Sequence, residues 1–270
     1  MRIEFNLNDI HALVIDMDGV LWRGDTPLPG LTNFFDFLQS RSIPFILATN
    51  NSSKTPGQYL QKLTGFGVNI ELEHVLTSSL ATAAYLEQVL EDRAAVYVVG
   101  QDGLRQVMRN AGFTVLDDSS QPAAAVVAGI DFTLTYDKLK HAVLLIQRGA
   151  RFIGTNGDLT FPLENGFAPG AGSILAAIQA ATGVAPVIIG KPERVMFDLA
   201  MQKMGSIPEH TAMLGDRLET DILGGQRSGL KTIMVTTGVD NEDTVAQKDI
   251  HPDAIFSGVD ELVQHWTALG

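Results

Sequence analysis

The chain of 270 residues contains no cysteine. Disulfide bridges, thiolate nucleophiles and cysteine-based zinc sites are therefore excluded. Basic residues are also scarce, because 19 lysines and arginines stand against 31 aspartates and glutamates, which gives a formal net charge of −12 at pH 7. Without a cationic surplus to neutralise a phosphate backbone, a nucleic-acid partner is not expected. A small anionic substrate remains compatible with this charge, because a few local cations and a metal ion can override the global field.

Long apolar runs are missing as well. No stretch approaches the ~18 uninterrupted apolar residues that a membrane helix needs. The first nine residues are polar and mixed in charge, unlike a signal peptide. We therefore expect a soluble, cytoplasmic protein with no membrane partner. The 45% of hydrophobic residues suffices for a core, and 19% of charged residues is too low for a disordered chain.

Short apolar runs alternate with helical periodicity over most of the chain. Continuous apolar strands separated by helices indicate a parallel sheet covered on both faces, and hence an α/β fold. The apolar runs predict strands at Ala12–Asp16, Pro44–Thr49, Ala94–Gly100, Ala123–Gly129, Arg151–Thr155, Val187–Gly190, Thr211–Asp216, Lys231–Thr236 and Ala254–Phe256. The periodicity predicts helices at Leu80–Leu90, Gly103–Asn110, Tyr136–Arg148, Gly172–Ala181, Arg194–Met204 and Glu219–Gly229.

Two carboxylates follow the first apolar run, in the order Asp16-Met17-Asp18-Gly19. Ligands of open α/β sheets bind beyond the carboxyl ends of the strands, and paired carboxylates are costly there unless a cation compensates them. Mg²⁺ fits this position, since it takes one or two carboxylates together with phosphate oxygens. One carboxylate could attack phosphorus while the other carries a proton to the leaving group. The alternative is an ordinary Asp-rich turn that closes a strand.

Two further strand ends offer groups for phosphate. Thr49 is followed by Asn50, and a hydroxyl and an amide there could hold phosphate oxygens through side-chain and backbone donors. A polar loop before the next helix is the alternative. Lys191 lies between a glycine and a proline at the end of another apolar run, where its ammonium could neutralise a phosphate or a phosphorylated aspartate. A solvated surface lysine is the alternative.

A last acidic pair follows the apolar run that begins at Thr211. Asp216 ends this strand and is a natural further metal ligand, whereas Asp221 lies about one turn into the next helix. Asp221 could orient Lys191 or a metal-bound water. In the alternative interpretation, Asp221 interacts only with the helix dipole.

These polar strand ends occur only before and after the middle of the chain. The middle has strands and helices of its own, as a domain inserted between two halves of a core would have. We therefore predict a catalytic core from residues 1–77 plus 186–270, and an inserted cap domain from residues 78–185.

The order and spacing of the four segments resemble the signature motifs of the haloacid dehalogenase (HAD) superfamily. These motifs are DxDG, a strand-end threonine, a distant lysine and GDxxxTD. The resemblance covers nearly the whole chain and is closest to the NagD-like, 4-nitrophenylphosphatase-type phosphatases, which carry an inserted cap. Segments that match this subfamily are Ala124–Asp131, Thr135-Tyr136, Gly154–Asp158, Pro169–Gly172, Gly190-Lys191-Pro192 and Met196-Phe197. The resemblance implies a Rossmann-like parallel-sheet core with a smaller α/β cap.

The resemblance also implies a magnesium-dependent phosphatase for a small phosphorylated metabolite. Asp16 would be the nucleophile, forming an aspartyl-phosphate, and a Mg²⁺ ligand. Asp18 would be the general acid and base and would ligate the metal through its backbone carbonyl. The other roles implied are phosphoryl binding by Thr49, backbone groups of Asn50 and Lys191, completion of the metal site by Asp216, and support of that site by Asp221.

Substrate selection in such enzymes lies in the cap. Asn156, Asp158 and Phe167 are candidates for substrate contacts, with roles in turns and packing as the alternative. Caps of this kind often dimerise, so a homodimer through the cap is a further expectation. For Trp22, just after the first motif, two interpretations stay open, since it could pack in the core or line the site's entrance.

Other activities are compatible with the same fold. A phosphotransferase or mutase would pass the phosphoryl group to a second substrate instead of water. A dehalogenase has no need of Asp18, and a phosphonatase would need an amine from the cap, whereas Lys138 and Lys140 lie on an amphipathic helix and are expected to be solvated. A non-catalytic phosphometabolite sensor is the alternative outside enzymes, although both motif aspartates are intact.

Overall fold

The computed structural model of the protein describes residues 5–163 and 166–269. The chain separates into two compact units. Unit 1 comprises Met1–Thr49, Pro56–Leu76 and Lys191–Gly270, and unit 2 comprises Asn50–Thr55 and Thr77–Gly190. Unit 2 thus takes in the short segment 50–55, which follows directly on Thr49.

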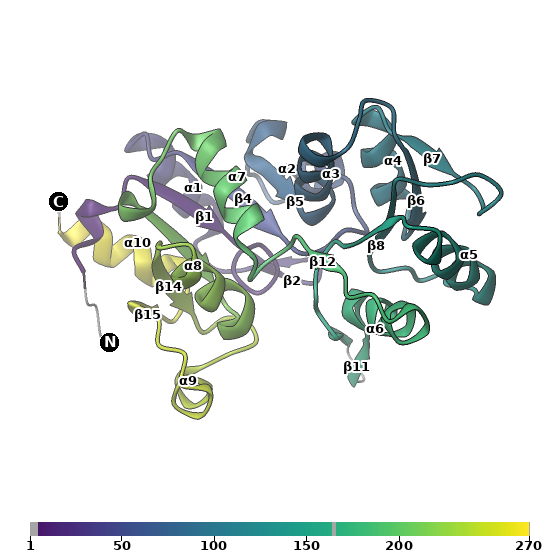
Figure 1. The fold of residues 1–270 in the computed structure, drawn as a ribbon. Coiled ribbons are helices and arrows are strands. Elements are labelled where there is room, and N and C mark those ends of the chain that lie inside the picture. Colours follow the sequence, from purple (N-terminus) through teal and green to yellow (C-terminus); the bar gives the residue numbers. More distant parts are fainter. Residues whose placement is uncertain (1–4, 164–165, 270) are drawn as a thin grey trace. The chain divides into compact units, whose positions relative to one another are not determined.

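Unit 1 is built on a six-stranded sheet (Figure 1). Its order is β15 (Ala254–Phe256), β14 (Lys231–Val235), β13 (Thr211–Gly215), β1 (Ala12–Ile15), β4 (Phe45–Thr49) and β5 (Val75–Thr77). The central strand β1 is parallel to both neighbours, so that Leu13 lies opposite Ala212 on one side and Phe45 on the other. Strands β13, β14 and β15 are likewise parallel to one another. Parallel strands need crossover connections, and helices supply most of them.

Helices cover both faces of this sheet. They are α1 (Leu31–Ser40), α2 (Pro56–Gly65), α7 (Arg194–Met204), α8 (Leu223–Arg227), α9 (Glu242–Lys248) and α10 (Val259–Ala268). Helix α1 packs against α10, and the core between them and the sheet contains Leu13, Ile15 and Leu214. Met234, which points the other way from its neighbours in β14, packs with Leu218 in a separate cluster. Four neighbouring side chains of α1 are buried, namely Phe34, Phe35, Phe37 and Leu38.

The order of the strands explains where a ligand can bind in unit 1. From β1 the chain moves outward to β4 and β5, whereas from β13 it moves the opposite way to β14 and β15. The reversal falls between β1 and β13, and a crevice outside the carboxyl ends of the strands at such a point is where open α/β sheets bind ligands. Asp16 follows β1 and Asp216 follows β13, so both acidic motifs begin at this reversal.

Unit 2 has its own five-stranded parallel sheet. Its order is β12 (Val187–Ile188), β9 (Arg151–Gly154), β8 (Ala125–Ala128), β6 (Ala95–Val99) and β7 (Thr114–Leu116). The helices of this unit are α3 (Ser78–Val89), α4 (Asp102–Asn110), α5 (Tyr136–Gln147) and α6 (Ala171–Thr182). An antiparallel hairpin of β10 (Thr160–Leu163) and β11 (Gly166–Pro169) precedes α6.

Short elements complete the fold. Strands β2 (Trp22–Arg23) and β3 (Thr26–Pro27) form a small antiparallel ribbon. Single turns of 3₁₀-helix lie at Leu7–Asp9, Leu72–His74 and Pro208–His210. The α/β class and all nine strands predicted from the sequence are confirmed. The helix expected at Glu219–Gly229 differs, because it begins as a π-helical turn at Leu218–Ile222 and continues as α8.

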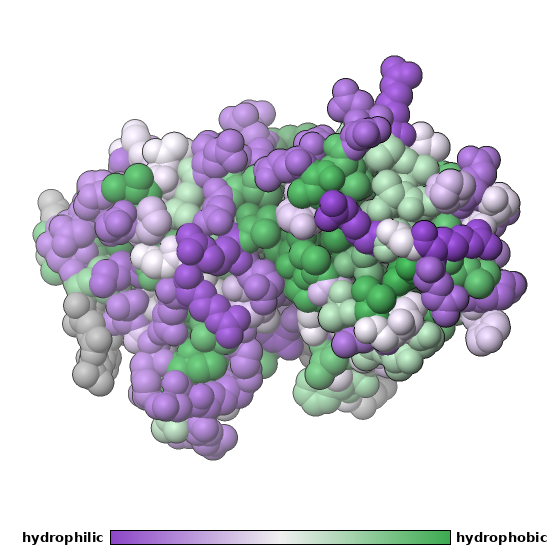
Figure 2. All heavy atoms as spheres, viewed as in Figure 1, coloured by the Kyte–Doolittle hydropathy of each residue, from purple (hydrophilic) through white to green (hydrophobic). Residues whose placement is uncertain are grey.

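The two units differ in surface character. Most exposed large hydrophobic side chains belong to unit 2, including Phe132, Leu159 and Phe167. Figure 2 shows hydrophobic residues in the region of α6, whereas the region of α9 in unit 1 is largely hydrophilic. Within the described residues, no helix has the length and apolar character required to cross a membrane.

Candidate active site

A buried lysine lies at the centre of the polar groups of unit 1. Lys191 is 2% exposed, and its Nζ contacts Asp16 Oδ1 at 2.5 Å and Asp221 Oδ1 at 2.7 Å. It also donates to the carbonyl oxygen of Ala48 at 2.9 Å. Three segments that are far apart in the sequence therefore meet at one ammonium group. The solvated-lysine alternative for Lys191 is wrong.

The π-helical turn after β13 positions Asp221. Its wide backbone bond runs from the Ile222 N–H to the Arg217 carbonyl at 3.2 Å. This geometry turns the Asp221 carboxylate back toward the strand end, where Oδ2 accepts the N–H groups of Asp216 at 3.3 Å and Arg217 at 3.1 Å. Asp221 is 1% exposed. Of the two sequence interpretations, orienting Lys191 agrees with this contact, whereas interaction with the helix dipole alone does not.

Asp216 is held by a glycine-containing loop that follows β14. Its Oδ2 accepts the Val239 N–H at 2.7 Å. A β-carbon at Gly238 would overlap the Asp216 carboxylate, and one at Gly19 would collide with the same carboxylate oxygen, Oδ2. Gly19 also has a φ of +91°, a conformation that side chains disfavour. Two backbone segments therefore approach this carboxylate closely, which only glycine permits at Gly19 and Gly238.

Burial and like charge make these carboxylates costly to ionise. Burial raises the pKa of Asp16 well above its ordinary value, and the charges of Asp221 and Asp216 add to the rise despite Lys191. Burial and the charge of Asp221 raise the pKa of Asp216 to about 7. Burial alone would lower the pKa of Lys191, but the charges of Asp16 and Asp221 more than reverse this effect, so the ammonium stays protonated.

The same cluster fits a divalent cation. Within the described residues, one group of three potential metal-binding side chains has ligand atoms within 4.8 Å of one another, and it consists of Asp16, Asp216 and Asp221. When all are ionised, three carboxylates and one ammonium leave two negative charges in a buried space. A divalent cation would balance them, and carboxylate oxygens are ligands that Mg²⁺ prefers.

Two other predicted residues lie beside this cluster in unit 1. Thr49 ends β4 and is buried, and it directly follows Ala48, whose carbonyl binds Lys191. Asp18 is exposed, and its Oδ1 accepts a hydrogen bond from Trp22 Nε1 at 2.6 Å. Trp22 is fully buried, so the core interpretation of this residue is correct. Its ring nevertheless reaches the candidate site through that hydrogen bond.

Comparisons with known proteins agree with this geometry. Residues 13–114 match the family described as haloacid dehalogenase-like hydrolase, and residues 188–262 match a HAD-hydrolase-like family. The acid sugar phosphatase of Staphylococcus haemolyticus is 40% identical over 257 residues, which are 95% of this chain and 97% of that protein. The 5′-nucleotidase YutF of Bacillus subtilis is 38% identical, over 93% of this chain and 97% of its own.

The chain belongs to the haloacid dehalogenase superfamily. NagD from Escherichia coli superimposes with a TM-score of 0.85 at 32% identity, covering 93% of this chain and 98% of NagD. Within the superfamily the chain is therefore a NagD-like phosphatase, as its motifs suggest.

In this NagD-like phosphatase, the remaining predicted residues gather in unit 2. Asn50 Nδ2 donates to Asp158 Oδ2 at 3.1 Å, and Asn156 Nδ2 donates to the Asn50 carbonyl at 2.7 Å. Asn156 is 4% exposed, and its Oδ1 accepts the Asp158 N–H at 3.1 Å, as in a turn. Ser78 Oγ donates to the same Asn50 carbonyl at 2.7 Å. The turn after β9 thus fixes the residue that follows Thr49.

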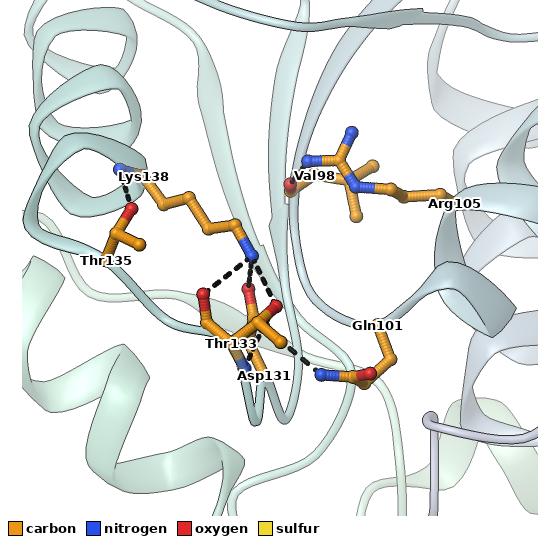
Figure 3. A network of polar contacts seen from close by, with 7 residues as sticks. All are labelled: Val98, Gln101, Arg105, Asp131, Thr133, Thr135 and Lys138. Carbon is orange, nitrogen blue, oxygen red and sulfur yellow. Dashed lines mark hydrogen bonds and ion pairs between the residues drawn. The ribbon is translucent and has the colours of Figure 1, made fainter.

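The lysine of unit 2 considered for Schiff-base chemistry is only partly exposed, and protein groups bind its ammonium. Lys138 Nζ contacts Asp131 Oδ2 at 2.7 Å and both the hydroxyl and the carbonyl of Thr133, at 2.9 and 3.1 Å (Figure 3). The Asp131 side chain is fully buried and also accepts from Gln101. The expectation for Lys138 was wrong, because a buried carboxylate 7 residues earlier attracts its ammonium. Lys140 is half-exposed and pairs with Asp137, as expected.

Several contacts of this NagD-like site were missed by the sequence analysis. They are the Trp22–Asp18 bond, the Val239 donor to Asp216, the Ala48 carbonyl on Lys191 and the Ser78 hydroxyl on Asn50. Three of the four involve backbone groups, which no residue pattern reveals. For one contact, the Val239 donor to Asp216, the sequence offered a signal in the preceding Gly238, just after β14.

Proposed function

We propose that this protein is a magnesium-dependent phosphatase that hydrolyses a small organic phosphomonoester through an aspartyl-phosphate on Asp16. The observation that carries the proposal is the Asp16–Lys191–Asp221 arrangement at the strand reversal of unit 1. A carboxylate that follows a buried strand and lies against a buried ammonium is suited to attack an anionic centre. The ammonium offsets the repulsion between the attacking carboxylate and the phosphate oxygens.

In the first step an Asp16 carboxylate oxygen attacks phosphorus, and the ester P–O bond breaks. Asp18 gives its proton to the leaving oxygen, so that the alcohol departs neutral. Lys191 remains charged throughout and interacts with the phosphoryl oxygens, together with the Thr49 hydroxyl and backbone groups of Asn50. Asp221 keeps Lys191 in place through its 2.7 Å contact. The products of this step are the alcohol and the acyl phosphate of Asp16.

In the second step water attacks the phosphorus of the acyl phosphate. Asp18, now a carboxylate, takes a proton from that water, and the bond between phosphorus and the Asp16 oxygen breaks. Inorganic phosphate leaves, Asp16 is restored as a carboxylate and Asp18 is restored as an acid. The same side chain therefore serves as acid and then as base, which suits its exposed position beside a buried nucleophile.

Asp16, Asp216 and the backbone carbonyl of Asp18 would hold the magnesium ion. When bound, Mg²⁺ supplies positive charge that neutralises the carboxylates and the transferring phosphoryl group. The two surplus negative charges of the buried cluster support this assignment. The raised pKa values of Asp16 and Asp216 support it as well, because a cation would favour their ionised forms.

We propose a sugar phosphate, a nucleotide or a phosphoglycolate-like compound as the substrate. Relatives named as an acid sugar phosphatase and a 5′-nucleotidase support the first two classes. Asp158 is a better candidate than Asn156 for a contact with substrate, because Asn156 is buried and engaged with backbone groups. The homodimer through the cap remains a prediction.

The proposal is tested with nitrophenyl phosphate. We expect hydrolysis that stops with a chelator and returns with excess Mg²⁺, and full turnover after exhaustive chelation would refute the metal dependence. Mass spectrometry of acid-quenched enzyme should find one phosphoryl group on Asp16, and none in Asp16→Asn. A phosphoryl adduct that persists in this variant would show that Asp16 is not the nucleophile. Turnover also separates the phosphatase from a phosphometabolite sensor, and a panel of the three substrate classes identifies the preferred compound.

A further inference from the structure

A hydrogen bond fixes one oxygen of the exposed Asp18 carboxylate. Trp22 Nε1 donates to Asp18 Oδ1 at 2.6 Å. The backbone between the two residues is closed as well, since the Gly19 N–H donates to the Trp22 carbonyl at 2.8 Å. An exposed aspartate ordinarily samples several rotamers. Here a fully buried side chain restricts the carboxylate to one of them.

The Trp22 ring cannot easily turn away from Asp18. It packs with Tyr59 and Phe66, whose ring centroids lie 6.4 and 6.0 Å from it. Lys62 Nζ lies 4.6 Å from the ring centroid and donates to the Gly24 carbonyl at 2.6 Å, which holds the cation against the ring. A cation over the ring face draws electron density from the indole and so strengthens its N–H as a donor.

The direction of this hydrogen bond distinguishes the two oxygens of Asp18. An indole N–H can only donate, so Oδ1 has to accept. The carbonyl oxygen of a carboxylic acid is a stronger acceptor than its hydroxyl oxygen, so a protonated Asp18 places its proton on Oδ2. Among the residues that the structure describes, none donates a hydrogen bond to Oδ2. One oxygen is thus engaged with the protein, and the other is available for chemistry.

We propose that Trp22 is a positioning residue that holds Asp18 for proton transfer and makes Oδ2 the transferring oxygen. This inference rests on the proposed function, in which Asp18 is the general acid and base. As the ester bond breaks, the proton on Oδ2 passes to the leaving oxygen. In the second step, Oδ2 takes a proton from the water whose oxygen attacks phosphorus. Oδ1 accepts the indole N–H throughout and keeps the carboxylate in place.

The test is Trp22→Phe, which keeps an aromatic ring but has no N–H. Trp266→Phe is the matched control, because Trp266 is also buried and packs beside Phe37 in the same unit. Loss of a hydrogen bond to a charged group should lower kcat on the order of tenfold and leave KM nearly unchanged. With nitrophenyl phosphate, a leaving group that needs little protonation, Trp22→Phe should release about one equivalent in a burst before slow turnover. Phenyl phosphate, which needs the proton, should lose more of its first-step rate.

Three outcomes would overturn the inference. Wild-type turnover of both substrates in Trp22→Phe, while Asp18→Asn is impaired, would exclude a role of Trp22 and leave the proposed function intact. A reduced burst amplitude with equal losses for both substrates would show a merely structural role. Wild-type turnover in Asp18→Asn would instead refute the general acid and base, and with it the inference.

A spectroscopic measurement serves if Trp22→Phe does not fold. The chain has two tryptophans, so ¹⁵N-labelled enzyme gives two indole N–H signals. Asp18→Ala should move the Trp22 signal and accelerate its hydrogen exchange, because the acceptor is gone, while the Trp266 signal stays in place. An unchanged Trp22 signal would show that the hydrogen bond is absent in solution, and the inference would fail.

Discussion

Replacing Asp221 by asparagine tests how the buried lysine is held. Both sides of the Asp221 carboxylate face donors, since Oδ1 lies 2.7 Å from Lys191 Nζ and Oδ2 accepts two backbone N–H groups. An amide of the same shape has an acceptor on one side only. In either orientation, Asp221→Asn therefore directs its NH₂ group at another donor. The change isolates charge and hydrogen bonding, because it adds and removes no volume.

Two effects of opposite sign set the magnitude. Loss of a charge-assisted hydrogen bond at a buried group costs about 1.5–3 kcal/mol. Removal of one negative charge also relieves repulsion with Asp16 and Asp216, whose ligand atoms lie within 4.8 Å of Asp221. At an effective dielectric constant near 20, one such repulsion amounts to about 3 kcal/mol. In the absence of metal this relief opposes the loss, so Asp221→Asn should be destabilised less without Mg²⁺ than with it. With Mg²⁺ bound the repulsion is already compensated, and the full loss of about 1.5–3 kcal/mol should appear.

The assay is urea unfolding of wild type and Asp221→Asn, with and without Mg²⁺. Asp198→Asn is the matched control, because Asp198 is half-exposed and pairs with Arg194 at 3.6 Å, an interaction worth less than about 1 kcal/mol. Turnover should fall by roughly 10–100-fold in Asp221→Asn, as for other residues that orient a ligand group. Equal unfolding free energies of Asp221→Asn and wild type in both conditions would refute the reasoning, as would a larger loss without Mg²⁺ than with it.

Two further predictions concern unit 2 and the loop at Asp216. Burial raises the pKa of Asp131, but the hydrogen bonds of Lys138 and Thr133 lower it by more, so the net pKa lies below its ordinary value of 3.8. The stabilisation of the fold by ionised Asp131 is therefore complete above the ordinary pKa and is lost as pH falls through the lower pKa of the folded state. The free energy of unfolding of Asp131→Asn, measured by urea titration, should be about 2–3 kcal/mol below that of wild type at neutral pH. This difference should close below pH ~4. A pH-independent difference would contradict this. Gly238→Ala should weaken Mg²⁺ binding measured by calorimetry, because its β-carbon would displace the Asp216 carboxylate, whereas Gly65→Ala, with open space around it, should not.

The amino-acid sequence by itself determined the class of fold and predicted the candidate site. Apolar runs such as Ala12–Ile15 can only be buried in a covered parallel sheet, and the polar residues that follow them must then lie at one edge of it. Asp16, Thr49 and Asp216 could be selected for this reason alone. Their motif spacing also identified the superfamily, because that spacing reflects the order of strands along the chain.

Only the tertiary structure decided which of these groups touch. The Lys191–Asp16 pair spans 175 residues and the Asn50–Asp158 pair spans 108, and no local pattern encodes such contacts. The sequence left Asp221 between two roles and Trp22 between two positions. A π-helical turn settled the contact of Asp221, and the packing of Tyr59 and Phe66 settled the place of Trp22. Lys138 was misjudged because the sequence indicates an exposed helix face but does not reveal that the neighbouring Asp131 carboxylate is buried. Burial depends on what packs above a residue, and that is a property of the whole fold.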